Sequence, residues 1–486
     1  MENKSYKALL FDFDGTLFDT KDLNYKAYSL AYFDLGIEIT RDMFAKTDGL
    51  SVYDFNRAMG VECDVEKLRE LKARYYAKYS LYATPNEYLL NVIETTELKT
   101  ALVTTARWKN ILPLLDKYNL VNKFYSIVTQ EDVKNHKPSP DAYIKTINNL
   151  GLNAEDCLAF EDSRPGFVSA RRAKIDCVRV KNFEKDCIRD MSGGSDSTTK
   201  LLWSEENSGL VVEKRAVTPQ AIQRLKAQYE SLQNFNLPKE SENYNFVLHH
   251  YIKPLSAEFT ETSGYYTMPF VFANTLYEYK DRISIFFDVL CGIYRIFLLS
   301  QTQFVRDEVR KKSWERYIVP GLKIYTDALR DKVGSRNVRV NLPYKSWKQI
   351  PDFVDFYKKS TYHGDTTFEN ILVRRNSKIL LIDPVPDGNV VQGILHDFAK
   401  IGQSLMGYEA IRDGVEFDYS VEKQIFNDFT EKFFAENDRW ALKFHIACLF
   451  FRRLKHQVEQ RPELVIPYGN IALQLLTEFS KGEYQL

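Results

Sequence analysis

The chain has 486 residues, 44% of them hydrophobic and 27% charged, which is ordinary for a soluble globular protein but long for one hydrophobic core. Its 66 basic and 66 acidic side chains cancel, so no overall field favours nucleic acid or a membrane surface as a partner. The cysteines form no CxxC pair and the N-terminus carries no apolar signal segment, which indicates a cytoplasmic protein with free thiols. The apolar stretch 283–300 contains Asp288 and Arg295, so a buried helix is expected there instead of a membrane span.

The first part of the chain, residues 1–183, alternates apolar runs with helical segments. Strands are predicted for KALLF, TALVT, FYSIVT, CLAF and CVRV, with helices between them. One of these helices is expected to have Ser139 as its N-cap, Pro140 in its first turn and Gly151 past its end. The alternation predicts an α/β fold with a doubly wound parallel sheet. Residues 18–85 are helical in pattern and predict a cap inserted after the first strand.

Two carboxylates follow the first predicted strand, in FDFDGTLFDT. Asp12 and Asp14 stand where the carboxyl end of a parallel strand opens into a crevice, and Gly15 allows a tight turn there. A lone pair of this kind could simply end the strand with an Asx turn. Later strand ends add the other parts of a phosphoryl-transfer site: Thr104, Lys137, Glu161 and Asp162.

This ordered set of motifs resembles the haloacid dehalogenase superfamily over residues 5–183. The resemblance implies that Asp12 is a nucleophile that becomes an aspartyl-phosphate and that Asp14 is the general acid and base. It also implies that Thr104 and Lys137 hold the phosphoryl oxygens. The implied Mg2+ ligands are Asp12, Asp14, Glu161 and Asp162.

The DGT sequence favours a phosphatase, and a phosphomutase is the alternative. The cap indicates a small substrate that is enclosed from water. Lys46, Asp48 and Tyr53 in the cap are either substrate contacts or ordinary solvated residues.

Beyond residue 184 the pattern changes. The segment MSGGSDSTTK predicts either a linker or a loop that covers phosphates, and LLW with LVVEK predicts a hairpin. A helix is expected from Thr218 and Pro219 onward, followed by long aromatic-rich helices. A second hairpin is predicted for NILV, RRNSK and ILLID, and helices are expected after residue 417.

A second set of polar residues lies around that hairpin. In YHGDTTFENILV, Asp365 precedes Asn370, and Asp383 follows in LLIDP. This is the layout of a kinase catalytic centre, in which Asp365 accepts the proton of the acceptor hydroxyl and the other two residues hold Mg2+ on ATP. His363 is expected to order this loop instead of reacting.

The region resembles the aminoglycoside phosphotransferase and choline kinase families over residues 190–486. The resemblance implies a two-lobed, protein-kinase-like α+β domain, with a small lobe over about 190–270 and a large lobe over about 271–486. It implies a structural role for Asp397, in HDFAK, and adenine binding at a hinge that includes Met268. Lys214 would contact the phosphates, and either Glu230 or Gln228 would pair with it.

Neither DFG nor APE appears, and only a short segment separates Asp383 from Asp397. A small-molecule acceptor is therefore favoured over a protein. Trp440, Phe444 and Phe451 are expected in the core or in the acceptor pocket.

The sequence thus predicts a bifunctional enzyme that uses Mg2+ in both halves and ATP in the second. Its partners are a small phosphate ester and a hydroxyl acceptor, with neither nucleic acid nor a membrane. One half could instead be a nucleotide-sensing regulator, and the sequence leaves the substrates and the oligomeric state open.

Overall fold

The computed structural model describes residues 4–46, 56–58, 60–192, 197–234, 252–299, 303–360, 362–374, 378–385 and 389–486. The chain divides into two compact units. The first unit is formed by residues 2–221 and 262–270, and the second by residues 222–261 and 271–486.

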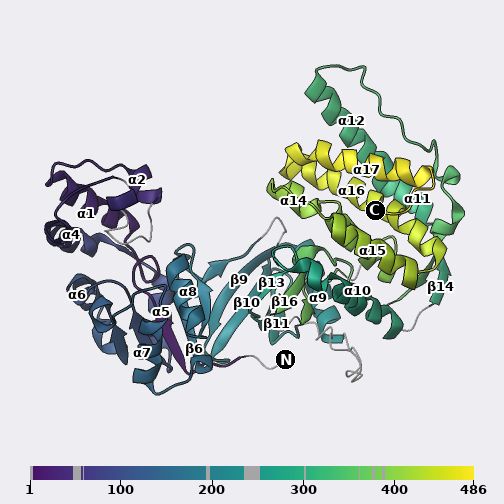
Figure 1. Ribbon diagram of the computed structural model, residues 1–486. Coiled ribbons are helices and arrows are strands. Elements are labelled where there is room, and N and C mark those ends of the chain that lie inside the picture. Colours follow the sequence, from purple (N-terminus) through teal and green to yellow (C-terminus); the bar gives the residue numbers. More distant parts are fainter. Residues whose placement is uncertain are drawn as a thin grey trace. The chain divides into compact units, whose positions relative to one another are not determined.

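A parallel sheet of five strands forms the centre of the first unit (Figure 1). In spatial order the strands are β5 (Ser126–Val128), β4 (Lys99–Val103), β1 (Ala8–Phe11), β6 (Cys157–Glu161) and β7 (Asp176–Arg179). All four residues of β1 are buried because helices cover both faces of such a sheet. Since the chain order reverses between β1 and β6, the carboxyl end of β1 lies at the switch point where α/β sheets bind ligands. The predicted strands and their parallel arrangement are confirmed.

Helices connect these strands: α5 (Glu87–Thr95), α6 (Trp108–Lys117), α7 (Asp141–Leu150) and α8 (Arg164–Arg172). The predicted start of α7 is wrong by one residue, because Pro140 occupies the N-cap position. Ser139 Oγ donates a hydrogen bond to Asp141 Oδ1 at 2.7 Å and caps no backbone N–H. Gly151 ends the helix as predicted, with φ of 66° in the left-handed region.

The segment between β1 and β4 forms the expected helical cap. Its helices are α1 (Lys21–Phe33), α2 (Arg41–Lys46) and α4 (Val65–Tyr79), which lie together beside the sheet domain in Figure 1. A short antiparallel pair, β2 (Phe18–Asp19) with β3 (Thr84–Pro85), joins the two ends of the cap. Two of the proposed substrate contacts, Asp48 and Tyr53, lie outside the described residues, as does the side chain of Lys46.

The first unit also contains an antiparallel sheet in the order β8 (Arg189–Asp190), β9 (Ser197–Ser204), β10 (Gly209–Ala216) and β12 (Gly264–Pro269). The predicted hairpin is β9 with β10. It joins the parallel-sheet domain through a hydrogen bond from Tyr6 N to Ser208 O, 2.9 Å long.

A second hydrogen bond joins this hairpin to the parallel-sheet domain: Trp203 N, in β9, donates to Tyr88 Oη, in α5, at 2.9 Å. The small lobe expected over residues 190–270 does not form one unit. Residues 222–261 belong to the second unit, and the rest of this range belongs to the first. Of the loop expected to cover phosphates, residues 193–196 lie outside the described part, and residues 197–200 belong to β9.

Helices make up most of the second unit, as predicted. In chain order they are α9 (Pro219–Asn234), whose first turn lies in the first unit, α10 (Arg282–Leu299), α11 (Val309–Ser313), a π-helical turn (Trp314–Ile318), α12 (Val319–Val333), α13 (Ile394–Leu405), α14 (Tyr408–Asp413), α15 (Ser420–Phe433), α16 (Glu436–Gln460) and α17 (Val465–Ser480). In the part of the chain that the structure describes, no helix is both long and apolar enough to cross a membrane.

The strands of the second unit are β11 (Ser256–Phe259), β13 (Ala273–Thr275), β14 (Gln303–Arg306), β15 (Phe356–Lys359), β16 (Ile371–Arg374) and β17 (Ile379–Leu381). The predicted second hairpin is β16 with β17, and β13 pairs with the other edge of β16.

Two of the three aromatic residues expected in the core or in the acceptor pocket belong to the core. Phe444 and Phe451 are buried in α16. Trp440 is partly exposed and stacks on Tyr484, with ring centres 4.6 Å apart, beside a cavity of about 590 Å³.

Candidate active sites

A buried lysine forms the centre of the first site. Lys137 Nζ donates hydrogen bonds to Asp12 Oδ1 at 2.6 Å, to Glu161 Oε1 at 2.6 Å and to Val103 O at 2.8 Å. The side chain of Lys137 is only 5% exposed. Burial alone would lower the pKa of Lys137, but the two carboxylates raise it, so the ammonium group stays charged. One cation thereby links the ends of β1, β4 and β6.

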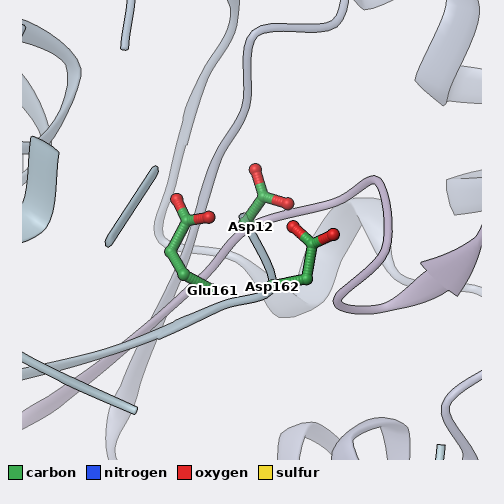
Figure 2. Close-up of side chains that lie close together, drawn as sticks. All are labelled: Asp12, Glu161 and Asp162. Carbon is green, nitrogen blue, oxygen red and sulfur yellow. The ribbon is translucent and has the colours of Figure 1, made fainter. Parts of the chain in front are cut away.

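Three carboxylates gather at the same edge of the sheet, as Figure 2 shows. Oxygen atoms of Asp12, Glu161 and Asp162 lie within 4.8 Å of one another. Burial and the charge of Glu161 raise the pKa of Asp12 to about 7, although Lys137 opposes the shift. Burial and the charge of Asp12 likewise raise the pKa of Asp162 to about 7. Mutual repulsion of this kind is relieved by a divalent cation with oxygen ligands, so these residues fit Mg2+.

Two glycines allow the carboxylates to pack this closely. Gly15 has φ of +78°, and a Cβ atom there would lie 2.2 Å from Asp162 Oδ2. A Cβ atom at Gly166 would lie 1.9 Å from Glu161 Oε2. Both distances are far below van der Waals contact, so any larger residue would displace an acidic side chain.

Asp14 is held apart from this cluster by two hydroxyl groups. Thr20 Oγ1 donates a hydrogen bond to Asp14 Oδ1 at 2.5 Å, and Tyr76 Oη donates to the same atom at 3.0 Å. Thr20 follows the first strand in sequence, whereas Tyr76 belongs to cap helix α4. The cap therefore contacts the residue expected to act as acid and base.

Thr104 directly follows β4 and is 2% exposed. Its Oγ1 accepts a hydrogen bond from Ala106 N at 3.0 Å, which fixes the side chain and leaves the hydroxyl proton for another acceptor. Because the preceding residue, Val103, accepts from Lys137, the Thr104 backbone lies next to the lysine. The structure thus brings the predicted residues of the first site to one edge of the sheet.

These features define the first part of the chain as an α/β enzyme domain with an acidic, metal-compatible site at the switch point of its sheet. Residues 9–180 match the family of haloacid dehalogenase-like hydrolases. The protein YhcW of Bacillus subtilis is 32% identical over 184 residues, which cover 36% of this chain and 84% of YhcW. The chain therefore belongs to this family, and residues 9–180 form a phosphatase domain of the haloacid dehalogenase superfamily.

Other relatives cover the same part of the chain. The phosphorylated carbohydrates phosphatase of Thermotoga maritima is 26% identical over 180 residues, which cover 35% of this chain and 83% of that protein. The crystal structure of CbbY from Rhodobacter sphaeroides in complex with phosphate is 21% identical and has a TM-score of 0.34. That match covers 36% of this chain and 87% of CbbY.

The second site lies in the loop before β16. Asn370 Nδ2 donates to the backbone oxygen of Asp365 at 2.9 Å and to its Oδ2 at 3.0 Å. Ile382 N donates to Asn370 O at 3.0 Å, so the hairpin places Asp383 beside Asn370, as the sequence predicted. Asp383 has φ of 59°, an uncommon left-handed backbone for a residue other than glycine.

Asp397, in the first turn of α13, holds this loop from behind. Its Oδ2 accepts a hydrogen bond from His363 N at 2.8 Å, and its Oδ1 accepts one from Gly364 N at 2.7 Å. His363 is fully buried, its Nδ1 accepts from Asp365 N at 3.2 Å, and burial lowers its pKa to about 4. A neutral His363 and Asp397 thus order the loop, which agrees with the structural roles expected for them.

The residues proposed for nucleotide binding belong to different units of the structure. Lys214 on β10 and Met268 on β12 are both buried in the antiparallel sheet of the first unit. Glu230, on α9 in the second unit, is exposed, and Gln228 is half-buried. Their roles stay predictions.

Sequence reasoning missed several partners of the two sites. Tyr143 Oη donates to Glu161 Oε1 at 2.7 Å, and Lys400 Nζ lies 3.1 Å from Asp365 Oδ1. Tyr76 comes from a cap helix that carries no motif. Only two residues had a usable signal: Thr20 belongs to the FDFDGTLFDT motif, and Lys400 lies one turn after Asp397.

Proposed function

We propose that the first unit hydrolyses a small phosphate monoester and that the second unit transfers the γ-phosphoryl group of ATP to a hydroxyl of a small polar metabolite. The observation that carries the first activity is the contact of Lys137 with both Asp12 and Glu161 at 2.6 Å. It holds a carboxylate nucleophile beside a permanent positive charge in a buried site.

The hydrolysis follows from the positions of these side chains. An oxygen of Asp12 attacks phosphorus, the ester P–O bond breaks, and protonated Asp14 gives its proton to the leaving oxygen. Asp14 then takes a proton from water, which attacks the aspartyl-phosphate and releases inorganic phosphate and the Asp12 carboxylate. Lys137 and the Thr104 hydroxyl donate hydrogen bonds to the phosphoryl oxygens.

Mg2+ bound by Asp12, Asp162 and the Asp14 carbonyl would neutralise charge on the phosphoryl group. Glu161 belongs to the same acidic group but shares Oε1 with Lys137 and Tyr143, so we assign it to positioning the lysine.

A small phosphorylated carbohydrate is the substrate class that we propose for this unit. The cap supplies Tyr76 to the acid and base residue Asp14, so the substrate must fit beneath the cap. The Thermotoga maritima relative, a phosphorylated carbohydrates phosphatase, supports this class.

The kinase activity is supported by the loop in the second unit. Asn370 and Lys400 fix both carboxylate oxygens of Asp365, while Asp397 fixes the backbone before it. In the proposed step the acceptor oxygen attacks the γ-phosphorus, its proton passes to Asp365, and ADP leaves. Asn370 and Asp383 would hold Mg2+ on the ATP phosphates.

Phosphorus NMR of the full chain with Mg2+, ATP and a panel of sugars, polyols and their phosphates tests both activities. Asp12→Asn should abolish phosphate release alone, and Asp365→Ala should abolish ATP-dependent phosphorylation alone. Asp19→Asn and Asp352→Ala, at exposed positions, are the matched controls.

Two results would change the proposal. Phosphate retained on the product, with none released, would show that the first unit is a phosphomutase. ATP binding without transfer to any acceptor, combined with altered phosphatase kinetics, would show that the second unit is a regulator.

A further inference from the structure

Every N–H group of Lys137 already has an acceptor inside the protein. Its Nζ atom donates to Asp12 Oδ1 and to Glu161 Oε1 at 2.6 Å each, and to Val103 O at 2.8 Å. An ammonium group has three N–H donors, so these acceptors use all of them. A phosphoryl oxygen can therefore accept from Lys137 only if one of the three acceptors is released.

Asp12 is the acceptor that the reaction itself weakens. Val103 O belongs to the backbone of β4, so the strand sets its direction. In the proposed hydrolysis an oxygen of Asp12 forms the bond to phosphorus, and the carboxylate loses its negative charge as charge gathers on the phosphoryl oxygens. Since charged acceptors form the stronger hydrogen bonds, Lys137 exchanges Asp12 for a phosphoryl oxygen and keeps its bonds to Val103 and Glu161.

Glu161 must stay in place during this exchange, yet it holds Lys137 through one oxygen only. Oε1 accepts from Lys137 Nζ at 2.6 Å and from Tyr143 Oη at 2.7 Å. Oε2 is buried and has no hydrogen-bond partner among the residues that the structure describes. Lys137 cannot fix the carboxylate that fixes Lys137 itself, so Tyr143 is the independent hydrogen-bond donor that orients Glu161.

Tyr143 is held firmly in the core of the first unit. It lies in the first turn of α7, is fully buried, and packs in the same hydrophobic core as Ala159 and Cys177. The centre of its ring lies 5.4 Å from Lys137 Nζ. Burial and the charge of Glu161 raise the pKa of its phenol well above the usual value, so the hydroxyl group stays protonated and remains a donor.

We propose that Tyr143 is a positioning residue of the phosphatase site, which holds Glu161 so that Lys137 can redirect one N–H group from Asp12 to the phosphoryl group. This inference rests on the proposed hydrolysis by the first unit. Tyr143 takes no part in bond making: the new O–P bond forms at Asp12, the ester P–O bond breaks, and the phenol proton stays on its oxygen.

Tyr143→Phe removes the hydroxyl group and keeps the ring, so it isolates this hydrogen bond. In the full chain with Mg2+ and p-nitrophenyl phosphate, we expect kcat to fall about 10- to 100-fold, the usual cost of removing a partner that orients a site residue. The KM should change less than about 2-fold, because Lys137 is positioned chiefly for the transition state. A kcat within about 2-fold of the wild type, or a loss confined to KM, would overturn the proposal.

Tyr125→Phe, at a residue that is 71% exposed, is the matched control and should leave both kcat and KM unchanged.

A double-mutant cycle tests whether Tyr143 acts through Glu161. Glu161→Ala removes the carboxylate and should lower kcat at least as much as Tyr143→Phe does. In Glu161→Ala/Tyr143→Phe the lost hydroxyl had no carboxylate left to hold, so we expect no further loss relative to Glu161→Ala. Losses that multiply would show that the two residues act independently, and would refute a role through Glu161.

Fluorine NMR with Mg2+ and beryllofluoride reports on Lys137 without turnover, because beryllofluoride binds to a carboxylate as an analogue of a phosphoryl group. The resonance of the fluorine that accepts from Lys137 should shift in Tyr143→Phe and stay in place in Tyr125→Phe. An unchanged resonance in Tyr143→Phe would contradict the proposal. If the wild type binds beryllofluoride but releases no phosphate from any ester, the hydrolysis fails, whereas the fluorine shift still decides whether Tyr143 positions Lys137.

Discussion

Replacing Lys137 by methionine should destabilise the first unit strongly, because it removes the cation that pairs with two buried carboxylates. The lysine is 5% exposed and lies 2.6 Å from both Asp12 and Glu161, whose side chains are 10% and 0% exposed. Methionine fills similar space, so the change isolates the charge. Removing one partner of a buried ion pair costs about 3–5 kcal/mol.

The loss of stability caused by Lys137→Met should be larger at high pH than at low pH. The pKa of Asp12 is raised from 3.8 to about 7 in the folded protein, so its carboxylate destabilises the fold increasingly as the pH rises through that range. The metal-free wild type should therefore be less stable at pH 8 than at pH 5. Without Lys137 the same carboxylates repel each other more, so the loss caused by Lys137→Met should be smaller at pH 5 than at pH 8.

Urea unfolding followed by hydrogen exchange and mass spectrometry measures this effect. Peptides from β1 and β6 report on the first unit alone. Lys145→Met is the matched control, because Lys145 forms a surface ion pair with Asp132 at 2.9 Å. That substitution should cost less than about 1 kcal/mol.

A second substitution tests the cause. In Lys137→Met/Glu161→Gln one buried charge is removed, while the glutamine oxygen can still accept from Tyr143, so about 1–3 kcal/mol should be recovered. A loss below about 1 kcal/mol for Lys137→Met, or further destabilisation in the double variant, would refute the electrostatic account.

Three further predictions concern the same sites. Gly15→Ala should abolish phosphatase activity and weaken Mg2+ binding in a calorimetric titration, because its Cβ would lie 2.2 Å from Asp162 Oδ2; unchanged Mg2+ affinity would contradict this. Tyr76→Phe removes a 3.0 Å hydrogen bond to Asp14 and should lower the kcat of phosphate release about 2- to 10-fold, and an unchanged kcat would show that the contact is incidental. Asp397→Asn leaves unpaired one of the two backbone N–H groups, those of His363 and Gly364, that donate to Asp397. It should lower ATP-dependent phosphorylation about 10- to 100-fold without changing phosphate release. An equal loss of both activities would argue against a local effect.

The sequence alone was sufficient for the strands of the parallel sheet, for two hairpins and for bringing the expected residues of the first site to one edge of that sheet. Apolar runs such as those of β1 and β6 can be recognised locally, because strands buried on both faces need an apolar side chain at nearly every position. The carboxyl ends of parallel strands meet at one edge of a sheet, so the sequence predicts that Asp12, Thr104 and Asp162 lie together. The β16–β17 hairpin was predictable for a different reason: a turn between two apolar runs determines which residues of the two strands face each other.

Only the tertiary structure decided which side chains support these residues. Tyr76 reaches Asp14 from the cap and Tyr143 reaches Glu161 from α7, and neither contact leaves a trace in the local sequence pattern. Side-chain periodicity reports which face of a helix is buried, but not which distant residue it meets, because that depends on how whole elements pack. The motifs therefore predicted the main residues of each site, whereas packing determined which side chains surround and position them.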